Sequence, residues 1–278
     1  MTMSDATGGW EQVAPAWERN RERVFETFRS SSEWLLRAAE IGEGATVLEL
    51  AAGPGETGFL AADRVGPSGR VISTDVAPTM VEAARRGAEA RGLGNVEAVV
   101  MDAQKLDLGD DAVDAVICRL GMMLVADPTR AFAEVRRVLR PGGRFAYTTI
   151  GVPDQNQWMG VMMWALVENG HQLGAEDPFA FGGPFSLASP DRNVELLLAA
   201  GFDDAQADVL GGVFRFESAD DYWNIQTTLA EPVRVAIETM DDEQAAAVRS
   251  TLDQMLAPFG VDGGLALPTQ VVTSVATA

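Results

Sequence analysis

Apolar residues in the first forty positions of the chain recur at the spacing of an α-helix. Trp10, Val13, Ala14 and Trp17, for example, are spaced so that they share one face of a helix. The first group is Trp10, Val13, Ala14, Trp17, Val24, Phe25 and Phe28, and the second is Trp34, Leu35, Leu36, Ala38 and Ala39. We therefore expect residues 1–44 to form a helical lead-in or lid that ends at Gly42 and Gly44.

Between residues 45 and 150 short apolar strands alternate with helical segments. The predicted strands are 46–50, 69–74, 96–101, 112–117 and 144–150, and the predicted helices are 58–64, 78–90 and 127–139. Pro78 and Pro128 stand at helix starts, and the run from Arg140 to Gly143 ends the last of these helices. The alternation predicts an α/β fold with a parallel sheet, helices on both faces and right-handed crossovers.

The pattern becomes less regular after Gly151. Helices are predicted at 157–168, 190–200, 219–240 and 243–256, and strands at 204–210, 213–216 and 265–276. We interpret residues 151–187 as a cap insertion over the substrate site. Residues 188–278 are expected to complete the sheet, and residues 217–262 are expected to form a helical insertion within this segment. We therefore interpret the chain as one domain with its core at 45–150, and not as two domains.

The charge of the chain excludes some classes of partner. Its 21 basic and 41 acidic residues give a net charge of −20 over 278 residues. Such a chain repels phosphate backbones and anionic membranes, so neither nucleic acid nor a membrane is expected as a partner. No apolar run approaches the roughly 18 residues of a membrane span. A small-molecule substrate is expected, and the sequence leaves the oligomeric state open.

Cysteine and the first residues indicate the compartment. Cys118 is the only cysteine, which excludes an internal disulfide and a cysteine-based metal cluster, and no metal site is predicted. The segment from Met1 to Trp10 lacks the basic region and the apolar core of a signal peptide. We therefore expect a reducing, cytoplasmic setting.

A glycine-rich loop follows the first strand and carries the strongest signal for a ligand. The segment from Val47 to Gly58 reads VLELAAGPGETG, and Gly53 to Gly58 match the pattern G-x-G-x-x-G. Glycine permits positive φ and lets a ligand lie against bare backbone. The pattern alone fits either a nicotinamide or an adenosyl cofactor.

Two aspartates bear on the choice between these cofactors: a carboxylate at Asp75 suits either cofactor equally, and Asp102 is the less generic feature. Asp75 lies just past the second strand, where a carboxylate can accept both ribose hydroxyls, and Asp102 lies just past the third. A carboxylate at Asp102 can accept from an adenine amino group while the Ala103 N–H meets a ring nitrogen. Because ligands bind at the carboxyl ends of strands in open α/β sheets, we expect these residues to lie together.

These residues resemble those of the class I S-adenosylmethionine (SAM)-dependent methyltransferases, especially the ubiquinone/menaquinone-biosynthesis type and its small-molecule relatives. The resemblance covers about residues 45–150. The segments that carry it are Val47–Gly58, Ser73–Asp75, Asp102–Ala103, Asp111–Val116 and Glu134–Gly143, together with the lead-in from Trp10 to Trp17. One departure is Ala51, where many members carry the first glycine of the loop.

The resemblance implies a fold, a cofactor and a set of binding residues. The fold is a Rossmann-like, seven-stranded, mostly parallel sheet whose last strand, here 265–276, is antiparallel. SAM is the implied cofactor. The resemblance implies that the methionyl end of SAM faces Glu49, Ala51, Gly53 and Gly55, and that Trp17 lies near it. Asp75 would hold the ribose, and Val76, Asp102 and Ala103 would contact the adenine. Arg119 would line the junction between cofactor and substrate.

The substrate side is expected to be apolar. The predicted helix at 157–168 is rich in Trp and Met, and we expect Trp158 and Met162 to form one wall of a substrate pocket over the strand ends, with Met122 on the opposite side. Flexible thioethers suit irregular hydrophobic ligands. His171, the only histidine, is a candidate general base because its usual pKa suits that role. No acidic partner for it can be assigned from the sequence.

The expected reaction is methyl transfer to an oxygen, nitrogen or carbon atom of a small apolar or aromatic molecule. A base is needed only if the acceptor is still protonated, because the protein mainly has to align the reacting groups and exclude water. A nicotinamide oxidoreductase is the first alternative. It cannot use a Tyr-x-x-x-Lys pair, since Lys105 is the only lysine and residue 101 is Met. A non-catalytic SAM-binding module is the second.

Overall fold

The computed structural model describes residues 3–171 and 177–278, with side chains from residue 8 onward. Its strands are β1 (Thr46–Leu50), β2 (Arg70–Asp75), β3 (Val96–Val100), β4 (Val113–Arg119), β5 (Leu139–Ile150), β6 (Asp203–Phe216), β7 (Gly260–Val261) and β8 (Gly264–Thr277). Its α-helices are α1 (Met3–Arg19), α2 (Arg21–Thr27), α3 (Arg29–Ala38), α4 (Glu56–Val65), α5 (Pro78–Arg91), α6 (Pro128–Val138), α7 (Gln157–Glu168), α8 (Pro190–Ala199), α9 (Ala219–Leu229), α10 (Glu231–Glu238) and α11 (Asp242–Leu256).

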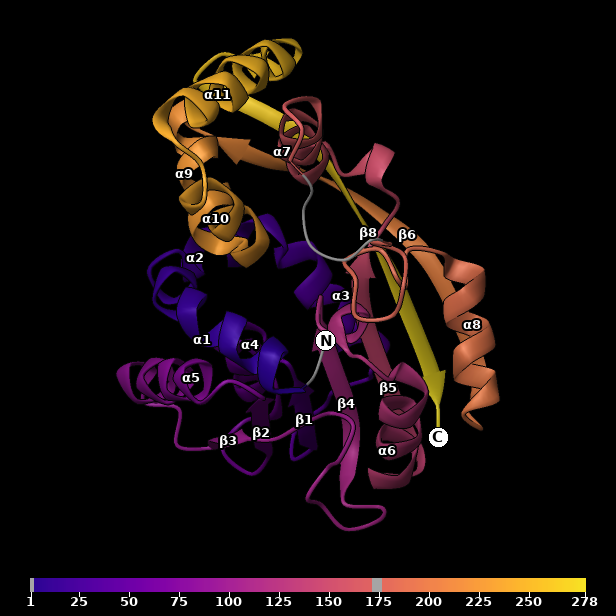
Figure 1. Ribbon diagram of the computed structural model, residues 1–278. Coiled ribbons are helices and arrows are strands. Elements are labelled where there is room, and N and C mark those ends of the chain that lie inside the picture. Colours follow the sequence, from indigo (N-terminus) through magenta and orange to yellow (C-terminus); the bar gives the residue numbers. More distant parts are fainter. Residues whose placement is uncertain (1–2, 172–176) are drawn as a thin grey trace.

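The strands form one sheet in the order β3-β2-β1-β4-β5-β8-β6 (Figure 1). Strands β1 to β5 are parallel to one another, and β8 runs antiparallel to both β5 and β6. The mostly parallel, Rossmann-like sheet with an antiparallel last strand is thereby confirmed. The difference from the seven expected strands is the two-residue β7, which pairs with β8 off the main path.

Alternation along the buried strands separates two layers of core. On β4, Ala115 and Ile117 point toward α3 and α4, whereas Val116 and Cys118 point toward α6 and β5's aromatic residues. These strand residues are almost completely buried, as expected for a parallel sheet covered on both faces. The predicted helices on both faces are confirmed.

A third apolar cluster packs together α7, α9, α10 and α11, which we call the cap helices, or the cap. It joins α7, α9, α10 and α11 to the first half of β8 and to the end of β6, and includes Met162, Tyr222, Leu252 and Phe214. In Figure 1 these helices lie above α1 and α2, where β6 and β8 extend past the other strands of the sheet. Val24 and Phe28 reach the same cluster, so the lead-in helices and the cap share a core.

Three predicted boundaries were wrong. Strand β5 begins at Leu139 because Leu139 pairs with Val113 and Arg144 with Ala115, so residues 140–143 form a bulge within the strand. Strand β6 is continuous through Gly211 and Gly212, which pair with β8. The helix predicted at 219–240 is two helices, because Ala230 is extended and Pro232 starts the second.

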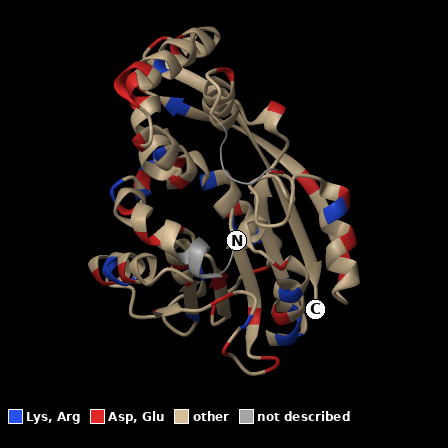
Figure 2. Cartoon of the chain, in the orientation of Figure 1, with Lys and Arg blue, Asp and Glu red and all other residues tan. Residues whose placement is uncertain are grey.

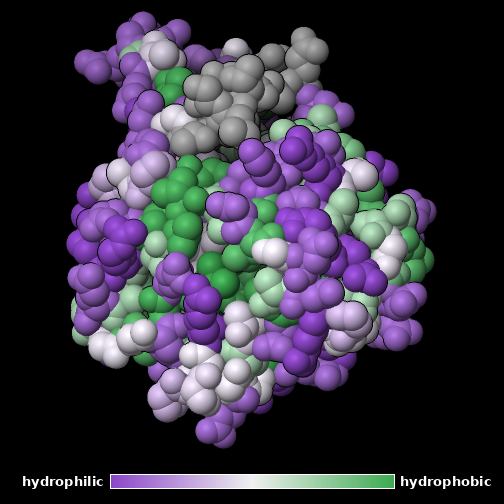
Figure 3. Space-filling model, turned by 90° about the horizontal axis from the view of Figure 1, so that it is seen from below, coloured by the Kyte–Doolittle hydropathy of each residue, from purple (hydrophilic) through white to green (hydrophobic). Residues whose placement is uncertain are grey.

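The surface of the molecule is acidic and mostly hydrophilic. Figure 2 shows Asp and Glu on helices throughout the view, and Figure 3 shows hydrophilic residues around a central group of hydrophobic ones on the face seen from below. None of the helices in the described part combines the length and hydrophobicity that a bilayer crossing requires.

Candidate active site

The β1–α4 loop turns sharply and leaves its backbone accessible. Ala51, Gly53 and Gly55 have φ values of 49°, 55° and 96°, and the left-handed region is open to glycine at little cost. A Cβ added to Gly53 would meet nothing within 4 Å, so there is room above the loop. A Cβ on Gly55 would lie 2.8 Å from Phe59, so this glycine is required by packing.

Glu49 lies beneath the loop and is buried. Its carboxyl group accepts hydrogen bonds from the Gly58 N–H at 2.8 Å and from the Ser73 hydroxyl at 2.8 Å. Burial raises the pKa of Glu49 to about 8, although Ser73 and the charge of Arg119 act in the opposite direction. A cation bound next to this residue would favour its ionised form.

Asp75 fastens the loop to the end of β2. Its carboxylate accepts from the Gly53 N–H at 2.9 Å and from the Ala77 N–H at 3.0 Å. Burial raises the pKa of Asp75, and these backbone hydrogen bonds oppose the rise. A carboxylate has about four acceptor positions, so the same group can still accept hydrogen bonds from a ligand.

Asp102 is brought next to Asp75, because the Met101 N–H donates to the Asp75 carbonyl oxygen at 3.0 Å. Its own carboxylate accepts from the Gln104 N–H at 2.9 Å, which is the geometry of an Asx turn. Val76 and Ala103 are partly buried beside these acids. The structure therefore gathers the predicted adenosyl-binding residues at one edge of the sheet.

Arg119 ends β4 at the same edge. Its guanidinium lies over the Phe28 ring, 6.0 Å from the ring centre, and its Nη1 atom is buried without a hydrogen-bond partner in the described part of the protein. Burial lowers the pKa of Arg119, and the charges of Glu49 and Glu56 oppose this. The turn that follows is tight, with Leu120 at a φ of 59°.

Trp17 connects the lead-in helix to the cap. Its indole N–H donates to the Leu229 carbonyl oxygen at 3.0 Å, and its ring packs edge-on against Trp10 at 6.1 Å. It also contacts the small cluster formed by Ala14, Ala77 and Met80, which adjoins the end of β2. A structural function of Trp17 is thus established, and its contact with a cofactor stays a prediction.

The three residues predicted to wall the pocket lie in two apolar clusters. Met122 and Met162 are 1% and 0% exposed and pack in different clusters, whereas the partly buried Trp158 contacts both. Of these three residues, Trp158 is the one that lies at the boundary between the clusters, where Leu120 also packs. Their contact with a substrate stays a prediction.

Two residues of α9 that the sequence did not indicate as site residues form hydrogen bonds to Trp158. The Tyr222 hydroxyl and the Gln226 amide both donate to the Trp158 carbonyl oxygen at 2.8 Å. They are four positions apart and so share a helix face. The spacing of Tyr222 and Gln226 could have indicated from the sequence that they act together. Their partner Trp158 lies more than sixty residues away in the chain, so it could not be inferred from that spacing.

His171 follows the end of α7. Its backbone N–H donates to the Leu166 carbonyl oxygen at 2.9 Å, which closes the helix. Within residues 3–171 and 177–278 no hydrogen bond or ion pair involves its imidazole ring. The structure does not bring it together with the other candidate residues.

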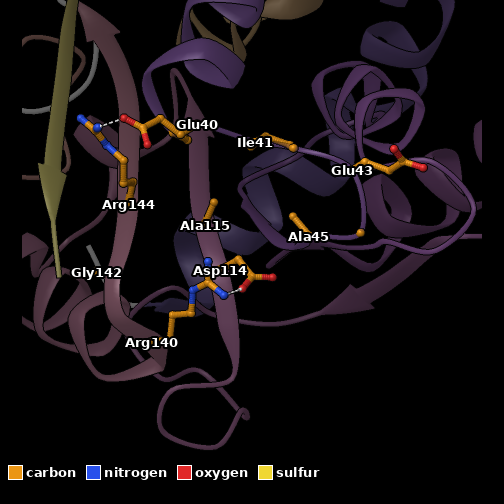
Figure 4. Close-up of a pocket in the computed structure, with 12 residues that line it drawn as sticks. Glu40, Ile41, Glu43, Ala45, Asp114, Ala115, Arg140, Gly142 and Arg144 are labelled. Carbon is orange, nitrogen blue, oxygen red and sulfur yellow. Dashed lines mark hydrogen bonds and ion pairs between the residues drawn. The ribbon is translucent and has the colours of Figure 1, made fainter.

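Two surface hollows lie at the opposite edge of the sheet. The first is lined mainly by residues 39–45, 114–115 and 140–144, including an Arg140–Asp114 ion pair of 2.5 Å and an Arg144–Glu40 pair (Figure 4). The second is lined by residues around Gly66 and Asn95. Both adjoin the amino ends of the strands, whereas ligands of open α/β sheets bind at the carboxyl ends. We therefore keep the carboxyl edge as the candidate site.

Comparison with known proteins adds a family and several relatives. A family described as methyltransferase domain matches residues 41–178. The nocamycin O-methyltransferase of Saccharothrix syringae is 27% identical over 86% of this chain and 87% of its own length. The 2-phytyl-1,4-naphtoquinone methyltransferase of Trichormus variabilis is 28% identical over 70% of this chain and 89% of its own length.

Other matches are more local or concern the fold alone. The arsenite methyltransferase of Halobacterium salinarum is 38% identical, but over 40% of this chain and 29% of its own length. The chain thus spans about a third of this relative and of one from Streptomyces fradiae. The structure of the YcgJ protein of Bacillus subtilis has a TM-score of 0.61, with 19% identity over 90% of this chain and 98% of that one.

Proposed function

We propose, on the premise that the chain belongs to the methyltransferase domain family through residues 41–178, that it is a SAM-dependent methyltransferase. The acceptor is an oxygen, nitrogen or carbon atom of a small, apolar or aromatic molecule. The observation that carries the proposal is the gathering of Glu49, Asp75 and Asp102 around the open glycine loop. Relatives named for methyl transfer to a naphthoquinone and to nocamycin support a small acceptor.

The residues at this edge fit the cofactor. The space above Gly53 admits a ligand against the backbone, and Asp75 offers acceptor positions to two ribose hydroxyls. Glu49 offers a carboxylate to the cationic methionyl end, and Asp102 with Ala103 would contact the adenine edge. When bound, SAM supplies an activated methyl group on a sulfonium.

The remaining contribution of the chain is alignment and exclusion of water. We expect Arg119 and Trp158 to line the substrate side of the site. Met122 and Met162 pack in the two apolar clusters that Trp158 contacts. We propose that residues 1–44, 151–187 and 217–262 act as the lid and cap over the core at 45–150. His171 is retained as a general base only for an acceptor that must lose a proton. A cytoplasmic location goes with this proposal.

Calorimetric titration of the purified protein with SAM tests the function, and NADH is the control ligand. We expect SAM to bind and NADH not to bind. Asp75→Ala should weaken SAM binding by tenfold or more, while Asp191→Ala, an exposed acid on α8, should leave it unchanged. Binding of NADH alone would favour the oxidoreductase. Binding of SAM without turnover on any quinone, phenol or enol acceptor would favour a non-catalytic module.

A further inference from the structure

A row of polar side chains crosses the sheet at the candidate site. In the parallel pairing of β4 with β5, Arg119 is opposite Thr148, so both side chains leave the same face. Thr148 is in turn opposite Thr273 on β8. Two members of this row have unsatisfied groups, because Arg119 Nη1 and Thr148 Oγ1 are both buried without a hydrogen-bond partner in the described residues.

The guanidinium of Arg119 also has no carboxylate partner within ion-pair distance in the residues that the structure describes. The carboxyl group of the nearby Glu49 is taken up by Gly58 and Ser73. Glu56 is paired with Arg21 at 2.5 Å and lies 3.5 Å from Arg91. Leaving a partly buried cation unpaired is costly, and an anionic group of a ligand placed here would offset that cost.

The surroundings of Arg119 are aromatic. Its guanidinium faces Phe28, whose ring lies edge-on to Trp158 at 6.1 Å and to Phe214 at 6.2 Å between centres. Trp158 belongs to the cap and Phe28 to the lead-in, so the unpaired cation lies where these two parts meet the end of β4. A planar ligand bound here would contact rings and place a polar edge on the guanidinium.

We propose that Arg119, assisted by the hydroxyl of Thr148, binds an ionised oxygen of the methyl acceptor. The acceptor class is then an acidic aromatic or enolic molecule, such as a phenolate, an enolate or an aryl carboxylate. Arg119 determines specificity for the anionic form through a charge-assisted hydrogen bond. This inference rests on the proposed function for the identity of the methyl donor.

The charge of the acceptor simplifies the chemistry. An ionised oxygen attacks the methyl carbon and forms a C–O bond, while the C–S bond breaks and its electron pair goes to sulfur. Anion and sulfonium become a neutral methyl ether or ester and a neutral thioether. No proton is transferred, so an acceptor that is already ionised needs no general base in this step.

The test uses two matched pairs of probes, with and without S-adenosylhomocysteine. In the first pair, the anion 1-naphthoate is compared with the neutral 1-naphthamide. In the second pair, 4-hydroxycoumarin, which is an ionised enol, is compared with the neutral coumarin. In the full-length protein we expect each anion to bind at least tenfold more tightly than its neutral counterpart. Arg119→Met should abolish this preference and leave the neutral probes unchanged. Thr148→Val should reduce it about threefold.

Controls separate this inference from other roles of Arg119. Arg70→Met, which removes an exposed guanidinium on β2, should keep the anion preference. If Arg119 binds the acceptor and not the cofactor, Arg119→Met should keep SAM affinity within about threefold. It should also leave the thermal midpoint nearly unchanged, since it removes a partly buried charge that has no ion-pair partner in the described residues. An unchanged anion preference in Arg119→Met, or no preference in the wild type, would overturn the inference. A loss of SAM affinity equal to the loss for the anions would instead assign Arg119 to the cofactor.

The proposed function can fail independently of this inference. A wild-type protein that does not bind SAM contradicts the proposed function. If the same protein still prefers the anions through Arg119, the anion site stands and only its use in methyl transfer is lost.

Discussion

Glu49 shows how a single residue can be costly to the fold and useful to a site. It is buried under the glycine loop, and a Cβ on Gly58 would lie 2.2 Å from its Oε2 atom. The loop therefore packs directly on a carboxyl group that prefers to be neutral when nothing is bound. A cationic ligand reverses that preference, so affinity and stability should respond to pH in opposite directions.

Glu49→Gln tests this at the residue scale. The pKa is about 8 in the folded protein against 4.5 ordinarily, so between these values the folded state holds a proton that the unfolded chain has lost. Stability of the wild type therefore falls as pH rises through this window. Glutamine has no such proton. We expect equal stabilities near pH 4.5 and a variant more stable by about 1–3 kcal/mol at pH 8.

Urea denaturation of both proteins at the two pH values measures this difference. Titration with SAM at pH 8 should show at least a tenfold loss of affinity in Glu49→Gln. A stability difference that does not change with pH would contradict the raised pKa.

Ala51 and Gly121 form a second residue-scale case. A Cβ on Gly121 would lie 2.4 Å from the Ala51 Cβ and 2.8 Å from Cys118 Sγ. Gly121→Ala should therefore destabilise the protein by about 1–3 kcal/mol. Ala51→Gly removes both the facing methyl group and a left-handed alanine, and should stabilise by up to about 1 kcal/mol.

A double-mutant cycle of these two changes measures their coupling. The pair should recover part of the loss seen in Gly121→Ala, because the clash with Cys118 remains. Strict additivity of the two free energies would show that the residues do not contact each other.

Helices and strands were predictable where the spacing of apolar residues and the turn residues indicated the same boundary. They were less predictable where a glycine pair lies inside a strand instead of ending an element. Gly142 and Gly143 end a helix in most contexts, but here they lie in a bulge within β5, with Gly142 at a φ of 76°. Gly211 and Gly212 remain in the β6 ladder because β8 pairs with them. The gathering of Glu49, Asp75 and Asp102 at one end of the sheet was predictable, because each lies at or just past the carboxyl end of a parallel strand.

Contacts between distant elements were not predictable. The bond from Trp17 to Leu229 joins residues 212 positions apart, and the pairing of Arg23 with Asp221 at 2.6 Å spans a similar distance. Both depend on how α9 lies against α1 and α2, which no local pattern specifies. These contacts make the lead-in and the cap one structural unit.

Trp17→Phe tests that unit at the scale of elements. It removes one hydrogen bond and keeps most of the ring packing, so stability should fall by about 1 kcal/mol. Hydrogen exchange should become faster in α1, α9 and α10 and remain unchanged in α4 and α6. Trp34→Phe on α3 is the matched control and should not affect α9 or α10. Equal changes throughout the chain would show that the cap and lead-in do not open as a unit.

At the scale of the whole molecule, the net charge of −20 acts on the compact state as repulsion. Many of the Asp and Glu residues lie on helices (Figure 2). Raising sodium chloride from about 20 mM to about 300 mM shortens the Debye length several-fold and should raise the thermal midpoint. Sodium sulfate at equal ionic strength separates charge screening from exclusion of the salt from the protein surface, because equal thermal midpoints in the two salts indicate screening. A thermal midpoint that does not change with sodium chloride would contradict the predicted charge repulsion.

The position of β8 has a consequence for synthesis of the protein on the ribosome. This strand is made after all the others, yet it lies between β5 and β6 and pairs with both. Until residues 264–277 have left the exit tunnel, β6 has no partner in the sheet and β5 has an open edge. The nascent chain must therefore keep two strand edges protected until its last strand arrives, and premature termination before residue 264 would leave both exposed to pairing with other chains.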